Sequence, residues 1–245
     1  MGVCSDWQYL TLFEKQISLK IKNSSWPVNR QWQKCMLNKF NISQSKLKLI
    51  VYIFLTVVTL AVYWQVNHFD FVNIDDNIYV TENSHIQSGI TMDGFRWAFA
   101  STYAEFWHPL TWLSLMLDYQ FYGLNAGGFH VTNLIMHILS TVLLFWLFHR
   151  MTGAVWKSAL VSALFALHPL HAESVAWVAE RKDVLSAFFW MLTLCLYVYY
   201  TEKPAVRRYL LVLFCFVRGF YHYNAFCPAK ALRKGCFLSH HLASC

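Results

Sequence analysis

The chain has 245 residues, of which 57% are hydrophobic, 18% are aromatic and only 13% carry a charge. A soluble domain carries about 25% charged residues, so the composition excludes an ordinary soluble enzyme and predicts a polytopic membrane protein. The net charge of +7 does not indicate nucleic acid as a partner, because positive charge gathers before the first apolar run: residues 1–48 hold eight Lys and Arg, whereas residues 67–129 hold seven acids and one base.

Residues 1–46 are polar and basic and show no strong periodicity. The first apolar run, residues 47–66, is long enough to cross the ~30 Å hydrocarbon core of a bilayer as a helix. It lies too far from the start for a cleaved signal peptide. The positive-inside rule then predicts a cytoplasmic N-terminal arm and an outer segment at residues 67–129. The arm either only sets this orientation or also contacts anionic membrane lipid.

Three further apolar runs are expected to cross the membrane: residues 130–148, 158–178 and 184–200. A fifth run, residues 209–217, looks too short for a full crossing. Most basic residues between the runs fall on the inner side, but Arg181 and Lys182 fall on the outer side and break the rule. The expected fold class is therefore all-α, a polytopic bundle of membrane helices with a long outer first loop.

Within the outer loop, residues 107–122 are rich in apolar and aromatic side chains but too short and too polar to span a bilayer. We expect a short helix at the membrane interface, with its Trp and Tyr rings at the level of the head groups. Pro109 near the start of this stretch suits the first turn of a helix.

The final segment, residues 218–245, has neither an apolar run nor an amphipathic face. We expect a tail that does not fold with the rest, as in a shifted reading frame or a truncated gene product. Three of the seven cysteines lie there near histidines, but the sequence has no CxxC pair and metal ligands usually come in tighter pairs. The cysteines therefore indicate no function.

Two adjacent acids, Asp75 and Asp76, follow the first span. Neighbouring carboxylates repel each other, which lets one of them hold a proton more tightly and act as a general base near neutral pH. The other interpretation is a solvated turn, in which Asp and Asn are simply good turn formers. The local pattern alone leaves both interpretations open.

Polar side chains also lie inside the second expected span, where His130, Asn133 and His137 share one helical face. Such residues usually face the interior of a bundle or a water-filled cavity. A functional cavity and simple hydrogen bonding between helices explain them equally well.

The third span ends in His168, His171 and Glu173. A metal site is one interpretation, but Pro169 disturbs the helix that would align these ligands, so a polar cluster lining a cavity is favoured.

The charged turn that follows holds Arg181 and Lys182. An arginine can bind a phosphate through two parallel hydrogen bonds, so the pair suits a phosphate group. The alternative is a cluster of charges at a helix end, in which both cations pair with Glu180 and Asp183.

Three strings together carry a resemblance: FVNIDDNIYV, WHPLTWLSLMLDYQFYGLNAGGFHVTNLIMH and LFALHPLHAESVAWVAERKDVLSAFFWMLTL. They resemble the N-terminal membrane part of tetratricopeptide-repeat glycosyltransferases. These are relatives of the transmembrane and tetratricopeptide-repeat O-mannosyltransferases, in the glycosyltransferase-C superfamily. The similarity covers about residues 47–217.

The resemblance implies an enzyme that moves a sugar from a polyprenyl-phosphate donor to a hydroxyl of a protein or glycan acceptor on the outer side. It implies that Asp75 or Asp76, with a preference for Asp76, deprotonates or orients this hydroxyl. It assigns the remaining roles by charge: Arg181 and Lys182 neutralise the leaving phosphate, and His108, His168 and Glu173 line the sugar or phosphate cavity. No cofactor is assigned, and a divalent metal stays open. A bacterial inner membrane is the expected location.

Two departures favour a different interpretation. No 34-residue repeat is visible, and the similarity stops near Arg218, where another apolar helix is expected. The chain is thus expected to be an N-terminal fragment with an incomplete donor cavity. The alternative function is a non-enzymatic membrane scaffold or a nonfunctional truncated product. A small transporter has little support, because no inverted repeat is visible.

Overall fold

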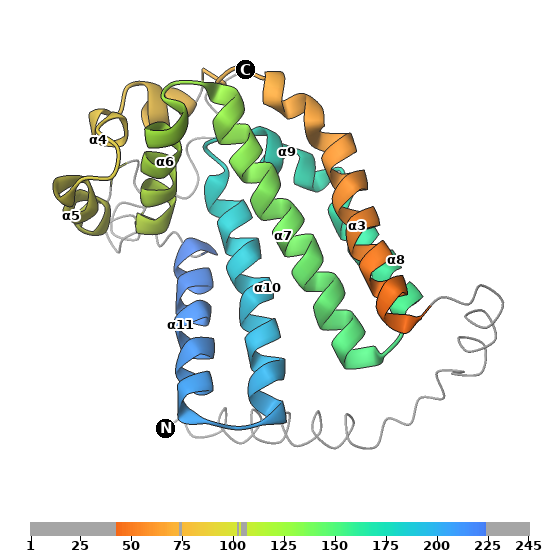
Figure 1. The fold of residues 1–245 in the computed structure, drawn as a ribbon. Coiled ribbons are helices and arrows are strands. Elements are labelled where there is room, and N and C mark those ends of the chain that lie inside the picture. Colours follow the sequence, from red (N-terminus) through yellow and green to blue (C-terminus); the bar gives the residue numbers. More distant parts are fainter. Residues whose placement is uncertain (1–42, 74, 102, 104–106, 224–245) are drawn as a thin grey trace, which may run out of the picture. The chain divides into compact units, whose positions relative to one another are not determined.

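The computed structural model describes residues 43–73, 75–101, 103 and 107–223, with the backbone alone at 220–223. In this part of the chain every regular element is helical and none is a strand, which confirms the expected all-α class (Figure 1). Most of the basic arm and of the C-terminal tail, residues 1–42 and 224–245, lies outside the described residues.

The chain forms eleven labelled helical elements over the described residues. In chain order they are α3 (Gln44–Tyr63), η1 (Trp64–His68), η2 (Asn77–Thr81), α4 (Ser84–Gln87), α5 (Met92–Ala100), α6 (Pro109–Tyr122), α7 (Ala126–Thr152), α8 (Val155–Ala166), α9 (Leu170–Ala176), α10 (Arg181–Glu202) and α11 (Val206–Tyr223).

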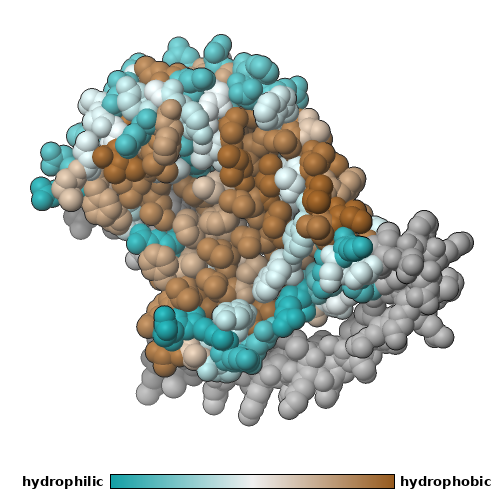
Figure 2. Space-filling view, in the orientation of Figure 1, coloured by the Kyte–Doolittle hydropathy of each residue, from teal (hydrophilic) through white to brown (hydrophobic). Residues whose placement is uncertain are grey.

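Three stretches of the described residues are long and apolar enough to cross a membrane: Gln44–His68, which joins α3 and η1, then α7 and α10. A fourth crossing exists if α8 and α9 together count as one span, but this pair is bent by 60°. On the face drawn in Figure 2, hydrophobic residues form a band over the middle of the helices and hydrophilic residues gather toward its two ends. This distribution is that of an integral membrane protein.

The expected span at residues 158–178 corresponds to α8 and α9, which are bent by 60° at the break that contains Pro169. α8 ends at Ala166, and α9 begins after Pro169. A proline has no backbone N–H to donate and its ring clashes with the preceding turn, so a helix cannot run straight through it. The axis of α9 therefore departs from that of α8 by 60°, and the chain continues from the end of α9 to α10.

α7 is the central helix, and it packs against α8, α9, α10 and η1. Its start is fixed by Asn125, whose side chain accepts a hydrogen bond from the N–H of Gly127. A Cβ on Gly127 would collide with the backbone oxygen of Asn67, so only glycine allows η1 to approach here. α7 ends at Gly153, which adopts the left-handed conformation common after a helix.

The segment between η1 and α7, which keeps the name outer segment from its expected side, is a folded unit rather than an irregular loop. Thr91 caps α5, and Asn83 caps α4, through side-chain oxygens that accept backbone N–H bonds. The short helix expected at residues 107–122 is α6, and Pro109 stands in its first turn. α6 buries Trp112 in an aromatic and aliphatic core, so one face of this helix packs on protein.

α11 packs along α10, and the two lie side by side in Figure 1. The helix is longer than the expected run at residues 209–217 and continues to Tyr223. Its start is tied to the end of α10 by Arg208, which donates to the backbone oxygen of Lys203 at 2.9 Å and lies over the ring of Tyr199 at 3.9 Å.

Candidate active site

Asp76 is fully buried and joins two distant parts of the chain. Its Oδ2 accepts a hydrogen bond from the backbone N–H of Val72 at 2.8 Å, and its Oδ1 accepts one from the N–H of Ala179 at 2.8 Å. Burial raises the pKa of Asp76, and the negative charge of Asp75 adds to this, whereas the two N–H bonds oppose it. Asp76 thus holds the outer segment against the connection between α9 and α10.

Asp75 is half-buried beside Asp76. Its carboxylate makes no hydrogen bond within the part of the chain that the structure describes. Burial raises the pKa of Tyr79 above its ordinary value, and the negative charges of Asp75 and Glu180 raise it further. Tyr79 therefore stays a neutral phenol at physiological pH. The negative charges of Asp75 and Glu180 both lie near enough to affect its pKa, although they come from different segments of the chain.

Arg181 is also fully buried, and its guanidinium group is bound by other residues of the protein. Its Nη2 lies 2.6 Å from Oδ2 of Asp118 and donates to the backbone oxygen of Phe129 at 2.8 Å. Its Nη1 donates to Oγ of Ser114 at 2.8 Å. Both terminal nitrogens of the guanidinium are therefore bound by the protein.

Asp118 is a functional candidate that the sequence analysis did not single out. It is the only acid in α6, and its Oδ1 accepts a hydrogen bond from Oγ1 of Thr132 at 2.9 Å. Burial raises the pKa of Asp118, and the positive charge and hydrogen bond of Arg181 oppose this. A lone acid in an otherwise apolar helix was the signal that could have found it.

Lys182 differs from its neighbour because it stays partly exposed. Its Nζ lies 2.8 Å from Oε1 of Glu180, and about a fifth of each side chain is exposed, 21% and 20%. The pair expected from the charge pattern is thus formed between Lys182 and Glu180. In contrast to Arg181, whose side chain is 0% exposed, Lys182 thus keeps part of its side chain at the surface.

His108 is buried in the aromatic core of the outer segment. Its ring stacks on Tyr79, with centroids 5.7 Å apart and planes 11° apart, and it contacts Trp112 at 4.7 Å. His108 therefore packs against Tyr79, whose pKa the charges of Asp75 and Glu180 raise.

His168 and Glu173 occupy a different region, at the break between α8 and α9 and on α9, and both are exposed. Nδ1 of His168 accepts a hydrogen bond from the N–H of Leu170 at 3.3 Å. No group of three His, Cys, Asp or Glu residues that could hold a metal occurs among the described residues. No hydrogen bond or ion pair among the described residues joins His168 or Glu173 to Asp75 or Asp76.

The polar face of α7 makes hydrogen bonds between helices. Nδ2 of Asn133 donates to the backbone oxygen of Trp177 at 3.0 Å, and Nε2 of His137 lies 3.0 Å from the backbone oxygen of Ala166. Asn133 and Asp76 therefore both hold the chain between α9 and α10. Asn133 and His137 thus bond to neighbouring segments, and His137 also lines a cavity, so the two interpretations of this face both keep support.

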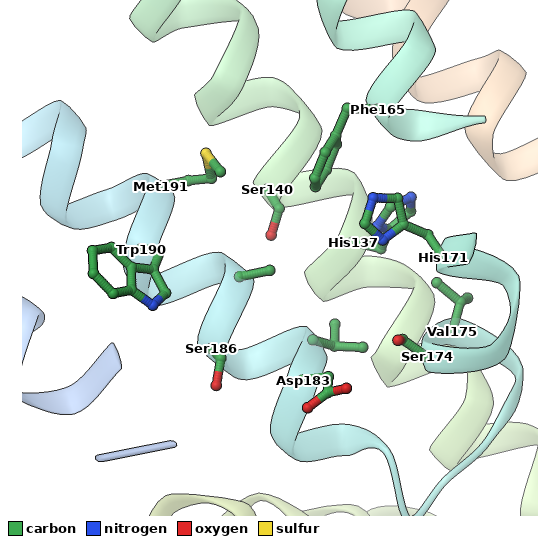
Figure 3. Close-up of a pocket in the computed structure, with 12 residues that line it drawn as sticks. His137, Ser140, Phe165, His171, Ser174, Val175, Asp183, Ser186, Trp190 and Met191 are labelled. Carbon is green, nitrogen blue, oxygen red and sulfur yellow. The ribbon is translucent and has the colours of Figure 1, made fainter. Parts of the chain in front are cut away.

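A cavity of about 570 Å³ lies between α7, the α8–α9 pair and α10 (Figure 3). Its polar lining includes His137, His171, Ser174 and Asp183, and its apolar lining includes Trp190 and Met191. The cavity borders the segment that carries Glu180 and Lys182, because Asp183 lines it.

Comparison with known proteins gives several relatives of one kind. Protein O-mannosyl-transferase Tmtc2 of Drosophila melanogaster is 37% identical over 93 residues, which cover 38% of this chain and 10% of the relative. Its counterpart tmtc2 of Xenopus laevis is 32% identical over 111 residues, 45% of this chain and 13% of the relative. Protein O-mannosyl-transferase TMTC4 of Mus musculus is 30% identical over 146 residues, 51% of this chain and 19% of the relative.

The chain has protein O-mannosyl-transferases as homologues. It spans only about a tenth to a fifth of the length of these relatives, since the matched shares are 10%, 13% and 19%. No protein-family model matches the chain. No solved structure matches it. The homology agrees with the resemblance drawn from the sequence motifs.

Proposed function

We propose that the chain carries the acceptor-activating part of a membrane glycosyltransferase, which moves a mannosyl group from a polyprenyl-phosphate carrier to a hydroxyl of a protein acceptor. The observation that carries the proposal is the Asp75–Asp76 pair: through the N–H of Ala179 at 2.8 Å, Asp76 ties this pair to the connection that leads into α10, whose first turn bears Lys182. A base and an anion-binding cation are thereby held on neighbouring segments. Homology to protein O-mannosyl-transferases supports the reaction class.

The two aspartates differ in environment, and this supports different roles. Both oxygens of Asp76 already accept backbone N–H bonds, and the residue is buried, so Asp76 is suited to positioning the segment. Asp75 is half-buried and its carboxylate is not used by a hydrogen bond to another described residue. We therefore assign the general base to Asp75, in place of the preference for Asp76 that the motif suggested.

The reaction balances with these groups. The acceptor oxygen forms a bond to the anomeric carbon of mannose, and the bond from that carbon to the carrier phosphate breaks. The proton of the acceptor hydroxyl passes to Asp75, and the leaving phosphate takes the bonding electrons. A positioned base of this kind contributes about 10²–10⁴-fold to a rate.

The leaving phosphate needs a cation, and the structure favours Lys182 over Arg181. Nη1 and Nη2 of Arg181 are taken by Ser114, Asp118 and Phe129 inside the protein. Lys182 is partly exposed and can exchange Glu180 for phosphate. A cation at the site where negative charge develops stabilises the transition state. Arg181 is assigned a structural role, because its charge is paired with Asp118.

The remaining expected residues take secondary places in this proposal. His108 supports Tyr79 from the aromatic core, and exposed His168 and Glu173 are candidates for contacts with the donor. The orientation, with the arm in the cytoplasm and the site outside, follows from the charge distribution of the chain and is part of the proposal.

A membrane scaffold without activity is the second candidate. The observation in its favour is that the buried polar side chains Asp76, Asp118 and Arg181 all bond to the protein itself. In that case these residues only hold the outer segment on the bundle. Replacing the partly exposed Asp75 or Lys182 would then leave the measured sugar transfer unchanged.

The test is a transfer assay with the purified full chain in proteoliposomes, using radiolabelled polyprenyl-phosphate mannose and a peptide rich in Ser and Thr. Asp75→Asn is expected to lower the rate by about 10²–10⁴-fold without changing the unfolding temperature. Asp93→Asn is the control, because this acid of α5 is 94% exposed and lies outside the site. A wild-type rate in Asp75→Asn, or no transfer by the wild type, would support the scaffold.

A further inference from the structure

Three charged side chains form a connected row at the start of α10: Lys182, Glu180 and Asp183. Nζ of Lys182 lies 2.8 Å from Oε1 of Glu180, and the side chain of Glu180 is also hydrogen-bonded to that of Asp183. Figure 3 shows Asp183 on the first turn of α10, among the residues that line the cavity. Glu180 therefore contacts both the cation that the proposed function assigns to the leaving phosphate and a second acid.

The hydrogen bond between the two acids requires a proton. An ionised carboxylate has acceptor oxygens only, so two carboxyl groups bond to each other only when one of them carries a hydrogen. Close carboxyl groups commonly share one proton in this way, because two like charges repel each other. Asp183 is exposed, so the proton can exchange with the solvent. Glu180 and Asp183 thus hold one proton between them and release it when the pH rises.

The charges around this row favour keeping the proton. Glu173 on α9 lies near enough to repel a negative charge on Asp183. The neighbouring cation Arg181 is paired with Asp118 of α6 inside the protein. Further titratable or charged side chains on the elements packed against α10 include two histidines that line the same cavity, His137 on α7 and His171 on α9, and Arg218 on α11, which lies over the ring of Phe214 at 5.0 Å.

The proton decides whether the row can accept an anion. With the proton in place, the charges of Lys182, Glu180 and Asp183 sum to zero, and a phosphate can replace Glu180 on the ammonium group. Without it, two carboxylates stand beside one ammonium group, and their net negative charge repels a phosphate. The exchange itself costs little, because a partly exposed ion pair such as that of Lys182 and Glu180 contributes little to stability.

We propose that the proton shared by Glu180 and Asp183 controls phosphate binding at Lys182: the anion displaces Glu180 from the ammonium group only while the two acids hold this proton. The displaced carboxylate of Glu180 keeps its hydrogen bond to Asp183 and so stays paired. This inference rests on the proposed function in one respect, the assignment of Lys182 as the phosphate-binding cation. It adds that binding of the lipid-linked phosphate weakens as the pH rises.

The test measures binding of a single-tailed phosphodiester, methyl dodecyl phosphate, to the purified full chain in lipid nanodiscs between about pH 5 and pH 9. This probe carries one negative charge throughout that range, so a change in affinity reports a change in the protein. The affinity of the wild type is expected to fall about tenfold per pH unit once the acid pair loses its proton, because one proton is linked to binding. The infrared carbonyl band of a protonated carboxyl group should disappear over the same pH range.

Four variants connect this pH dependence to the row. Asp183→Asn has the charge of the protonated pair, so its affinity should not change with pH. Glu180→Gln frees Lys182 and should bind more tightly than the wild type at high pH, whereas Lys182→Met should bind at least tenfold more weakly at low pH. Asp93→Asn is the control and should keep the wild-type pH dependence. The unfolding temperature shows that each variant is folded, and a folded Asp183→Asn that keeps the wild-type pH dependence would overturn the inference.

Binding and sugar transfer are measured separately, so failure of this inference differs from failure of the proposed function. A wild type that binds the probe with the expected pH dependence but transfers no mannose contradicts the proposed function and supports the inference. A wild type that transfers mannose while its probe affinity stays constant with pH contradicts the inference alone. Absence of probe binding at every pH contradicts the assignment of Lys182 and therefore the inference as well.

Discussion

Replacing Asp118 with alanine removes the anionic half of the buried ion pair that Arg181 forms at 2.6 Å. The side chains of the pair are 0% and 5% exposed, so water cannot replace the lost carboxylate. Arg181 keeps its bonds to Ser114 and Phe129, but its charge is left in a low-dielectric site.

The expected cost follows from this burial. Removing one partner of a buried pair costs about 3–5 kcal/mol of unfolding free energy, because an uncompensated charge stays inside. An exposed pair contributes only about 0–1 kcal/mol. The pair of Arg150 and Glu202 provides this contrast in the same protein, since its side chains are 51% and 38% exposed.

The assay is equilibrium unfolding of Asp118→Ala and Glu202→Ala in mixed micelles with increasing denaturing detergent. Asp118→Ala should lose about 3–5 kcal/mol and Glu202→Ala less than about 1 kcal/mol. The double variant Asp118→Leu with Arg181→Met should recover most of the loss, because apolar side chains replace both charges. Equal losses in the two single variants would refute the role of the buried pair.

Two further predictions test the contacts at the start of α7 and beside the aspartate pair. Gly127→Ala should destabilise the protein strongly, because its Cβ meets the backbone oxygen of Asn67, whereas Gly153→Ala, in open space at φ 68°, should cost about 1–2 kcal/mol for its conformation in the same unfolding assay. Burial raises the pKa of Asp76 above its ordinary 3.8, so the folded state binds this proton more tightly than the unfolded state and the resulting stabilisation is lost as pH rises through the folded pKa. The wild type should therefore gain stability relative to Asp76→Asn as pH falls toward about 4, and a parallel pH dependence of the two proteins would contradict this.

The helices were predictable because apolar runs long enough to span a bilayer are a strong signal. The break at Pro169 and the start of α6 at Pro109 were also readable, since proline restricts the backbone in a known way. The fold of the outer segment was not readable as a unit, because it depends on which aromatic side chains meet. His108 and Trp112 are neighbours at the start of α6, but Tyr79 lies in η2, so only the tertiary structure reveals its contacts with both rings.

The candidate site was predictable in its residue types and less so in their roles. The charge pattern identified Arg181 and Lys182 together, but it could not show that Arg181 turns inward to Asp118 while Lys182 stays partly exposed. Likewise, adjacent Asp75 and Asp76 look equivalent in the sequence. Their difference arises from the N–H of Ala179, which comes 103 positions later in the chain and binds Asp76 alone.

The most direct test of the account is the mass of the acceptor peptide after incubation with the wild-type chain and polyprenyl-phosphate mannose in proteoliposomes. The account predicts a product heavier by one hexose, formed by the wild type and by Asp93→Asn and strongly reduced in Asp75→Asn. An acceptor peptide that keeps its original mass with the folded wild-type chain, or one modified equally by Asp75→Asn, would contradict the assignment of Asp75 as the base of a mannosyl transfer.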